Sequence, residues 1–184
     1  MGSPWSPEVY QRAALLAAKA HQGQMLPDSP APYLVHLMLV AAEVTAALQV
    51  EEGLDGDLAV ACALLHDTLE DTAVQSADLR REFGPLVAAG VQALTKDPAL
   101  PKEQRLADSL RRILAQPRET AREVALVKLA DRVVNLRPAP ASWTRAKIAA
   151  YREDAQIIRE TLGAASPHLA GRLARRIATY GVEA

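Results

Sequence analysis

The order of apolar and polar positions in this sequence predicts helices separated by short loops, and no stretch predicts a convincing strand. Ser6 and Pro7 form an N-cap and first-turn pair that opens a helix to about Gln22. A helix follows over residues 33–48, and a strongly apolar one begins at the acidic 55–57 segment and ends near 70–71. Ser76 is expected to cap a short helix that breaks at 84–85, and another covers 86–94. The remaining helices are expected to end before Pro117 and to cover 119–136, 144–162 and 167–180.

Prolines and glycines mark the predicted loops. They gather at residues 23–32, at 96–102 and in the run RPAPAS at 137–142, which is the clearest helix breaker in the chain. None of these loops is long enough to divide the chain in two. The sequence therefore predicts an all-α helical bundle that forms one domain over residues 1–184.

Composition supports this fold and restricts the partners. The chain has 184 residues, of which 49% are hydrophobic and only 4% aromatic, and its net charge is −1. With no strong overall charge, nucleic acid and anionic membranes are not expected partners. A membrane span would need roughly 20 consecutive apolar residues, which the sequence lacks, and no signal-peptide pattern opens it. Its one cysteine, Cys62, fits a reducing compartment, so we expect a soluble, cytoplasmic protein.

The candidate chemistry is concentrated at the end of the strongly apolar helix, where His66, Asp67, Glu70 and Asp71 fall within six positions. If the helix continues through them, His66 lies on the same side as Glu70, and Asp67 on the same side as Asp71. Buried carboxylates so close together repel each other unless a cation lies among them. Imidazole and carboxylate ligands together suit a divalent first-row metal such as Mn, Fe, Co or Zn better than Ca.

Two further ligands are expected from other helices. His36 stands in an apolar segment, where a lone histidine is more often a satisfied core residue than a ligand. Asp131 stands on another apolar helix, where it could instead form an ion pair with Lys128 or Arg132. Asn135 follows Asp131 by one helical turn, on the same face, and could reach a ligand held by the metal.

These residues resemble a known family. The order His36, His66-Asp67, Asp131 is similar to the H…HD…D pattern of the HD superfamily of metal-dependent phosphohydrolases. A longer set of motifs resembles the hydrolase domain of the Rel/Spo alarmone enzymes: AHQGQ at 20–24, PYLVH at 32–36, LLHDTLEDT at 64–72 and KLADRVVNL at 128–136. The resemblance covers about residues 10–160 and implies an HD-type bundle. No synthetase region follows it in the sequence, so the chain looks like a small stand-alone alarmone hydrolase of the stringent response.

The resemblance also implies roles for the site residues. His36, His66, Asp67 and Asp131 would bind Mn²⁺, with another divalent first-row metal as the alternative. Glu70 and Asp71 would act on the attacking water, and spacing does not decide which of them is the base. The reaction would release pyrophosphate from the 3′ position of (p)ppGpp or a related nucleotide, so the expected partner is a small-molecule nucleotide. The oligomeric state is not predicted.

Further substrate contacts are carried over from the family. They are Lys96, Lys102 and Tyr151, beside Asn135, although two loop lysines and a tyrosine at a core edge have ordinary structural explanations. One departure concerns the base. Family members that act on guanine alarmones usually carry an arginine and another basic residue after the AHQGQ motif, whereas this chain has Met-Leu-Pro-Asp at 25–28. We therefore expect Leu26 to cover the base, with (p)ppApp as a candidate substrate, unless Arg12 or Lys19 supplies the cation.

Two other functions compete with this prediction. Another HD nucleotide phosphohydrolase, either a nucleotidase or an NADPH 2′-phosphatase, would need the same metal site and a different base pocket. A non-catalytic alarmone-binding module would be expected to lose an acidic catalytic residue or a ligand, and this chain retains all of them.

Overall fold

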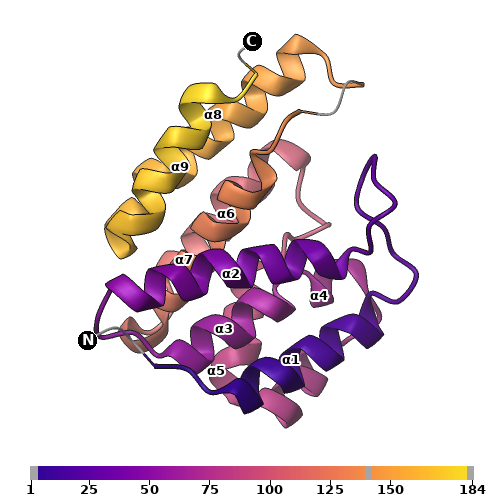
Figure 1. Cartoon of the computed structure of the whole chain (residues 1–184), viewed down its shortest axis with the longest axis vertical. Coiled ribbons are helices and arrows are strands. Elements are labelled where there is room, and N and C mark those ends of the chain that lie inside the picture. Colours follow the sequence, from indigo (N-terminus) through magenta and orange to yellow (C-terminus); the bar gives the residue numbers. More distant parts are fainter. Residues whose placement is uncertain (1–3, 140–141, 182–184) are drawn as a thin grey trace.

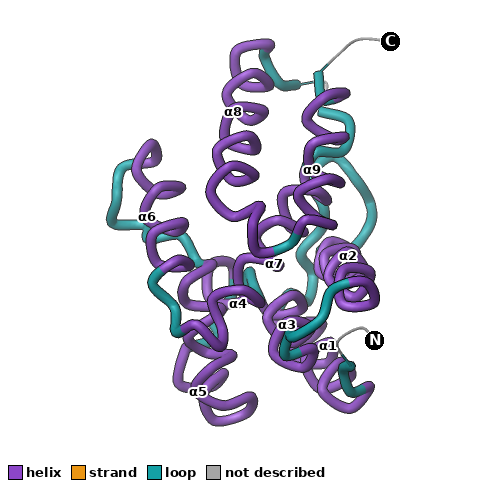
Figure 2. Tube along the Cα trace, turned by 90° about the vertical axis from the view of Figure 1, so that its left-hand side faces the viewer, coloured by secondary structure: helices purple, strands orange, loops and turns teal. Residues whose placement is uncertain are grey.

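The computed structural model describes residues 4–139 and 142–181, and within them all regular secondary structure is helical (Figures 1 and 2). The prediction of an all-α chain is confirmed. The elements are α1 (Pro7–Ala20), α2 (Leu34–Val50), α3 (Gly56–Leu65), α4 (Thr68–Asp71), α5 (Ser76–Leu94), α6 (Lys102–Leu114), α7 (Arg118–Asn135), α8 (Arg145–Leu162), the 3₁₀ turn η1 (Gly163–Ala165) and α9 (Pro167–Thr179).

Local capping explains where several helices begin. The Ser6 hydroxyl accepts from the Val9 amide at 3.1 Å at the start of α1, as the sequence predicts. At the start of α3, Asp55 Oδ1 accepts from the Leu58 amide at 2.9 Å. Helix α5 differs from the prediction, because its cap is the residue before Ser76.

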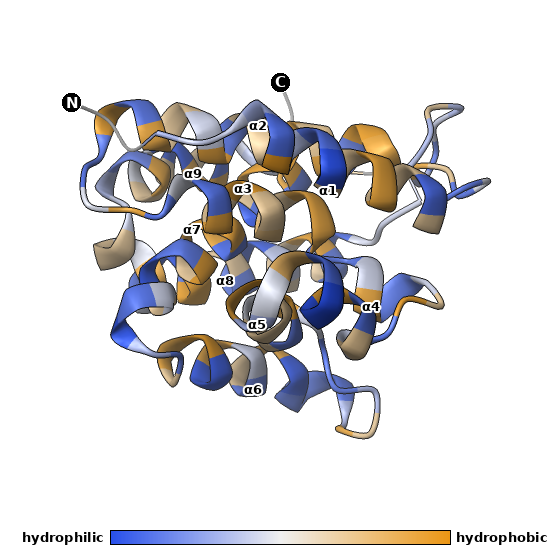
Figure 3. Cartoon of the chain, turned by 90° about the horizontal axis from the view of Figure 1, so that it is seen from below, coloured by the Kyte–Doolittle hydropathy of each residue, from blue (hydrophilic) through white to orange (hydrophobic). Residues whose placement is uncertain are grey.

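The α3 helix is the centre of the fold. All but one of its 10 residues are buried, and it packs against α1, α2, α5 and α7. Helices α8 and α9 lie side by side at one end of the molecule and pack on α7 (Figures 1 and 2). Hydrophobic and hydrophilic positions alternate around α1, α5 and α6, as expected for helices that bury only one face (Figure 3). The core therefore lies around α3 and α7, the two helices that lead to the candidate site.

Close packing around α3 depends on one glycine. A Cβ added at Gly90 of α5 would lie 2.9 Å from Cys62 Sγ and 3.0 Å from Val124 Cγ2, so these neighbours would have to shift. The absence of a side chain lets α5 rest directly on α3 and α7. Cys62 is a buried free thiol, as its apolar surroundings in the sequence predict.

Two boundaries differ from the sequence prediction. The apolar helix was expected to continue to residues 70–71, but α3 ends at Leu65 and the short α4 begins at Thr68. The Thr68 hydroxyl donates to the Leu65 carbonyl at 2.7 Å and stabilises the turn between them. The predicted break at 84–85 is a kink inside α5, where Gly84 has φ 87°. Of the RPAPAS loop, Pro140 and Ala141 lie outside the described residues.

The proline-rich segment 23–32 forms a compact turn rather than an open loop. Met25 and Pro32 form an isolated antiparallel bridge, and the Leu26 amide donates to the Ala31 carbonyl at 2.9 Å. In the part of the chain that the structure describes, no helix is both long and apolar enough to span a membrane.

Candidate active site

Four side chains from three parts of the fold meet at one point. His36 comes from α2, His66 and Asp67 from the turn between α3 and α4, and Asp131 from α7. His66 Nε2 lies 3.3 Å from His36 Nε2, 3.0 Å from Asp67 Oδ2 and 3.8 Å from Asp131 Oδ1. His36 Nε2 lies 3.6 Å from Asp67 Oδ2 and 3.5 Å from Asp131 Oδ1. The structure thus brings together all four residues that the sequence predicts as ligands.

This arrangement fits a divalent metal ion. A first-row metal bound about 2.0–2.2 Å from each donor separates neighbouring donor atoms by about 3.0–3.5 Å. The donor atoms of His36, His66 and Asp67 all lie within 4.8 Å of one another. His66 Nδ1 donates to the Ala63 carbonyl at 2.8 Å, so the lone pair of Nε2 is left to face the centre of the group. Both the donor types and their spacing are therefore suited to a metal.

The electrostatics of the site also favour a cation. Burial opposes the charged form of His66, but the Asp67 carboxylate beside it raises the pKa of His66 to about 9. Burial likewise opposes the ionised form of Asp131, yet a hydrogen bond to His36 and the charge of Lys128 hold the pKa of Asp131 well below its usual range. The carboxylates thus stay negative inside the protein, where a cation among them is favourable.

A hydrogen-bond network behind the site holds one ligand in place. The Tyr33 hydroxyl donates to Asp67 Oδ2 at 2.6 Å, and the Tyr33 ring stacks on His21 with ring centroids 5.1 Å apart. His21 Nδ1 donates to Gln24 Oε1 at 2.8 Å, and Gln24 Nε2 donates to the Asp71 carbonyl at 2.8 Å. Sequence reasoning assigned no role to Tyr33 or Gln24. Tyr33 stands three residues before His36, and this helical spacing indicates that the two side chains lie on the same face.

The acidic pair differs in its contacts. Both Glu70 and Asp71 line a small cavity of about 110 Å³ that also contains the four candidate ligands. Lys96 holds both oxygens of Glu70: its Nζ lies 2.8 Å from Oε1, and its amide donates to Oε2 at 3.1 Å. Within the described residues, no lysine or arginine forms an ion pair with the Asp71 carboxylate. Burial and the repulsion of Asp67 and Glu70 raise the pKa of Asp71 above its ordinary value.

Only some predicted substrate contacts lie at this cavity. Lys96 and Asn135 line it, and the Asn135 amide donates to Asp131 Oδ1. Lys102 is exposed at the start of α6, and Leu26 is half-buried in the 23–32 turn. Neither is among the described residues that line the cavity. Tyr151 also lies outside the cavity, with the Arg132 guanidinium 4.3 Å above its ring.

A lysine that the sequence suggested only as an ion-pair partner belongs to the cavity. Lys128 is 6% exposed, and its Nζ lies 3.5 Å from Asp131 Oδ2. Burial lowers the pKa of this lysine. Asp131 therefore contacts Lys128 through one oxygen and the two histidines through the other, so the ion-pair and ligand interpretations of Asp131 are compatible.

Comparison with known proteins gives consistent matches. A family model described as HD domain matches residues 13–165. The chain is 34% identical over 172 residues to a GTP pyrophosphokinase of Myxococcus xanthus, covering 90% of this chain and 21% of that protein. It is 30% identical over 182 residues to a guanosine-3′,5′-bis(diphosphate) 3′-pyrophosphohydrolase of Aquifex aeolicus, covering 98% of this chain and 23% of that protein. The chain thus spans about a fifth of the length of these two relatives.

A shorter relative matches over nearly its whole length. The guanosine-3′,5′-bis(diphosphate) 3′-pyrophosphohydrolase MESH1 of Xenopus tropicalis is 30% identical over 175 residues, covering 92% of this chain and 93% of the relative. A solved structure described as a metazoan ortholog of SpoT that hydrolyses ppGpp superposes with a TM-score of 0.81 at 24% identity. It covers 98% of this chain and 100% of that one. This structural similarity establishes a shared fold.

Proposed function

Since this chain belongs to the HD domain family, we propose that it is a metal-dependent hydrolase that releases pyrophosphate from the 3′ position of a purine nucleotide alarmone, (p)ppGpp or (p)ppApp. The observation that carries the proposal is the convergence of His36, His66, Asp67 and Asp131 beside an acidic pair in one cavity. The 3′-pyrophosphohydrolase relatives, one of which matches along almost its full length, support the same reaction.

The four converging residues would hold the metal, and we propose Mn²⁺ as the ion. When bound, such an ion withdraws charge from phosphoryl oxygens and makes a nearby water more acidic. The mixture of imidazole and carboxylate donors suits Mn²⁺ and neighbouring first-row ions rather than Ca²⁺.

Glu70 and Asp71 have different roles in the proposed reaction. Hydrolysis adds a water oxygen to the phosphorus attached to the ribose 3′ oxygen, breaks that P–O bond and returns a proton to the 3′ oxygen. We infer that Asp71 takes the proton of the water, because burial and neighbouring charge make it a stronger base than an ordinary aspartate. Glu70 holds Lys96 at the cavity through two contacts, so its main role is to place that cation.

The cations of the cavity would bind the pyrophosphate end of the substrate. Lys96, Lys128 and Asn135 offer donors around it, and two lysines there offset phosphate charge. A cavity of about 110 Å³ is too small for a whole nucleotide, which needs roughly 300 Å³ or more. The ribose and base must therefore lie outside it, where Leu26, Lys102 and Tyr151 remain candidate contacts.

The proposed base preference rests on the sequence of the 23–32 turn. The Met-Leu-Pro-Asp run at 25–28 has no cation to pair with guanine O6 and N7. An apolar Leu26 can cover either purine by dispersion without distinguishing their edges. We therefore propose that (p)ppApp is hydrolysed at least as well as (p)ppGpp.

A turnover assay tests the proposal. The protein is incubated in Mn²⁺ with ppGpp, pppGpp, ppApp or NADPH, and the products are analysed for pyrophosphate and phosphate. We expect pyrophosphate from the 3′-diphosphate nucleotides and little phosphate from NADPH. Asp131→Asn should abolish turnover, whereas Asp108→Asn, at an α6 ion pair outside the cavity, should not. Release of phosphate from NADPH without pyrophosphate from any alarmone would overturn the proposal.

A further inference from the structure

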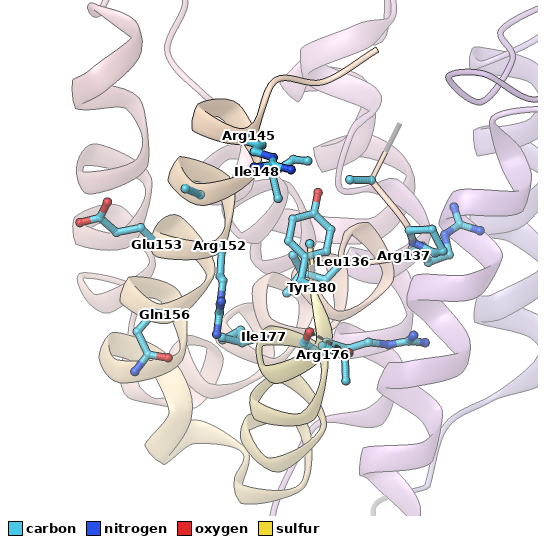
Figure 4. A pocket seen from close by; sticks show the side chains of 15 residues that line it. Leu136, Arg137, Arg145, Ile148, Arg152, Glu153, Gln156, Arg176, Ile177 and Tyr180 are labelled. Atoms are coloured by element: carbon cyan, nitrogen blue, oxygen red, sulfur yellow. Dashed lines mark hydrogen bonds between the residues drawn. The ribbon is translucent and has the colours of Figure 1, made fainter. Parts of the chain in front are cut away.

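A second, larger cavity lies apart from the acidic pair. It has a volume of about 1140 Å³ and opens between the segment after α7, the first half of α8 and the end of α9 (Figure 4). The Arg152 side chain lies on one side of Tyr180, and the side chains of Arg137 and Arg176 extend on the other (Figure 4). The described lining of this cavity shares no residue with that of the candidate active site. The groups that orient the acidic pair must therefore come from other segments.

The Asp71 carboxylate is placed by its backbone and not by a side-chain partner. Lys96 holds both oxygens of Glu70, whereas the Asp71 carboxylate makes no hydrogen bond or ion pair within the described residues. An aspartate side chain has only two rotatable bonds, so the position of the backbone decides which points in the cavity the carboxylate can reach. Asp71 is the last of the 4 residues of α4, where its carbonyl has no amide of its own helix to bond. The orientation of Asp71 thus depends on a donor from outside α4.

That donor is the side-chain amide of Gln24, at the base of the 23–32 turn. Gln24 Nε2 donates to the Asp71 carbonyl at 2.8 Å, and the Asp71 amide donates to the Asp67 carbonyl at 2.9 Å. Both backbone groups of Asp71 are therefore fixed, one by a candidate metal ligand and the other by Gln24. The Gln24 contact joins residues 47 positions apart and ties the segment after α1 to the end of α4.

The surroundings of Gln24 allow its amide only one orientation. The Asp71 carbonyl is an acceptor, so the NH₂ group must face it, and Oε1 then faces His21 Nδ1 at 2.8 Å. His21 Nδ1 must carry the proton, which agrees with the burial of His21 Nε2 away from any acceptor within the described residues. The Gln24 backbone is held as well, because its amide donates to the His21 carbonyl at 3.0 Å and its carbonyl accepts from the Tyr33 amide at 2.9 Å. Gln24 is thus a fixed donor.

We propose that Gln24 is a positioning residue for hydrolysis, which keeps the Asp71 carboxylate directed at the attacking water by holding the Asp71 carbonyl. The inference rests on the proposed function, in which Asp71 takes the proton of that water. Gln24 is not among the described residues that line the cavity, so it acts through Asp71 and not on the substrate or the metal. Without its donor, the end of α4 is less restrained and the carboxylate spends less time in the reactive position.

Gln24→Met tests this role, because methionine is an unbranched side chain of similar length that has no N–H donor. With ppGpp or ppApp, whichever the wild type hydrolyses faster, kcat should fall about tenfold or more. KM and the Mn²⁺ dissociation constant should change by less than about twofold, since the lining residues are untouched. A lower melting temperature with unchanged kcat would mean that Gln24 only stabilises the turn, and would overturn the proposal.

Gln22→Met is the matched control. It makes the same substitution at an exposed side chain of the same segment, and this side chain makes no hydrogen bond within the described residues. Its kcat should stay within about twofold of the wild-type value. A loss as large as that of Gln24→Met would show that the effect does not come from the contact with Asp71.

A double-mutant cycle shows whether Gln24 acts through Asp71. Asp71→Asn removes the base, so adding Gln24→Met to it should lower the remaining kcat by less than about twofold. If Gln24→Met lowers kcat by the same factor in both backgrounds, the two residues act independently and the inference is wrong.

Hydrogen exchange measures the same contact without turnover. In the Mn²⁺-loaded protein, peptides covering residues 67–74 should take up deuterium about three- to tenfold faster in Gln24→Met than in the wild type or Gln22→Met, as expected for the loss of one neutral hydrogen bond. Unchanged exchange would contradict the inference whether or not the protein is a hydrolase. If exchange rises as expected but the wild type turns over no alarmone, the proposed function fails and the role of Gln24 in hydrolysis fails with it, while the contact that holds α4 stands.

Discussion

Removing the Tyr33 hydroxyl should weaken metal binding without changing any ligand. Tyr33 donates to Asp67 Oδ2 at 2.6 Å, and the same oxygen lies 3.0 Å from His66 Nε2. Burial and the Asp67 charge raise the pKa of Tyr33, so the hydroxyl keeps its proton and remains a donor. Tyr33→Phe removes this hydrogen bond and keeps the ring that stacks on His21.

The size of the effect follows from the type of bond that is lost. A hydrogen bond to a charged group contributes about 1.5–3 kcal/mol. Since about 1.4 kcal/mol corresponds to a tenfold change in an equilibrium constant, the Mn²⁺ dissociation constant should rise by about 10- to 100-fold. Turnover at limiting Mn²⁺ should fall with it, whereas saturating Mn²⁺ should restore most of the activity.

Calorimetric titration of metal-free protein with Mn²⁺ measures this directly. Tyr10→Phe is the matched control: the Tyr10 ring packs on Trp5 with centroids 5.6 Å apart, and its hydroxyl makes no hydrogen bond within the described residues. A dissociation constant that stays unchanged in a folded Tyr33→Phe protein would refute the view that this hydroxyl holds Asp67 in its ligand position.

Substitutions at the metal ligands, the acidic pair and the 23–32 turn should give distinct signatures. Asp67→Ala should lose stoichiometric Mn²⁺, turnover and thermal stability, because a bound metal stabilises only the folded state; Mn²⁺ retained in that variant would remove Asp67 from the ligand set. Glu70→Gln and Asp71→Asn should keep the metal and lower kcat by roughly 10²- to 10⁴-fold, more in Asp71→Asn, and normal turnover in both would contradict the mechanism. Leu26→Arg should raise the kcat/KM ratio of ppGpp to ppApp about tenfold or more; a wild-type protein already strongly selective for ppGpp, and unchanged by the substitution, would contradict the argument on the base. The pKa of His66 without metal is about 9 and that of an unfolded histidine about 6.5. The stability it contributes is therefore complete below about pH 6.5 and lost as the pH rises to about 9, so the metal-free protein should melt at a lower temperature at about pH 9 than at about pH 6.

Much of the fold could be predicted because it depends on local signals. The cap at Ser6 and the acidic start of α3 begin helices where the sequence indicates, and the prolines and glycines mark the interruptions. The end of α3 could not be predicted, since the apolar pattern continues past Leu65. There the chain turns because the Thr68 hydroxyl and the His66 ring satisfy carbonyls of the last helical turn.

The part of the candidate site that could be predicted consists of residues within the family motifs. The residues matched by family motifs, such as His36 and Asp131, do meet in the fold. Contacts that depend on tertiary packing could not be predicted from the sequence. Lys96 meets Glu70 from 26 positions along the chain, and Tyr151, a candidate nucleotide contact, packs under Arg132.

The enclosed position of α3 bears on how this protein can evolve. A substitution along α3 disturbs neighbours on α1, α2, α5 and α7 together, so few changes there are tolerable. The 23–32 turn is mostly exposed or half-buried and can accept many side chains. We therefore expect descendants of this chain to inherit the His66-Asp67 turn almost unaltered while the residues around Leu26 drift. New nucleotide preferences can then arise at the rim of the site, with the hydrolytic centre passed on intact.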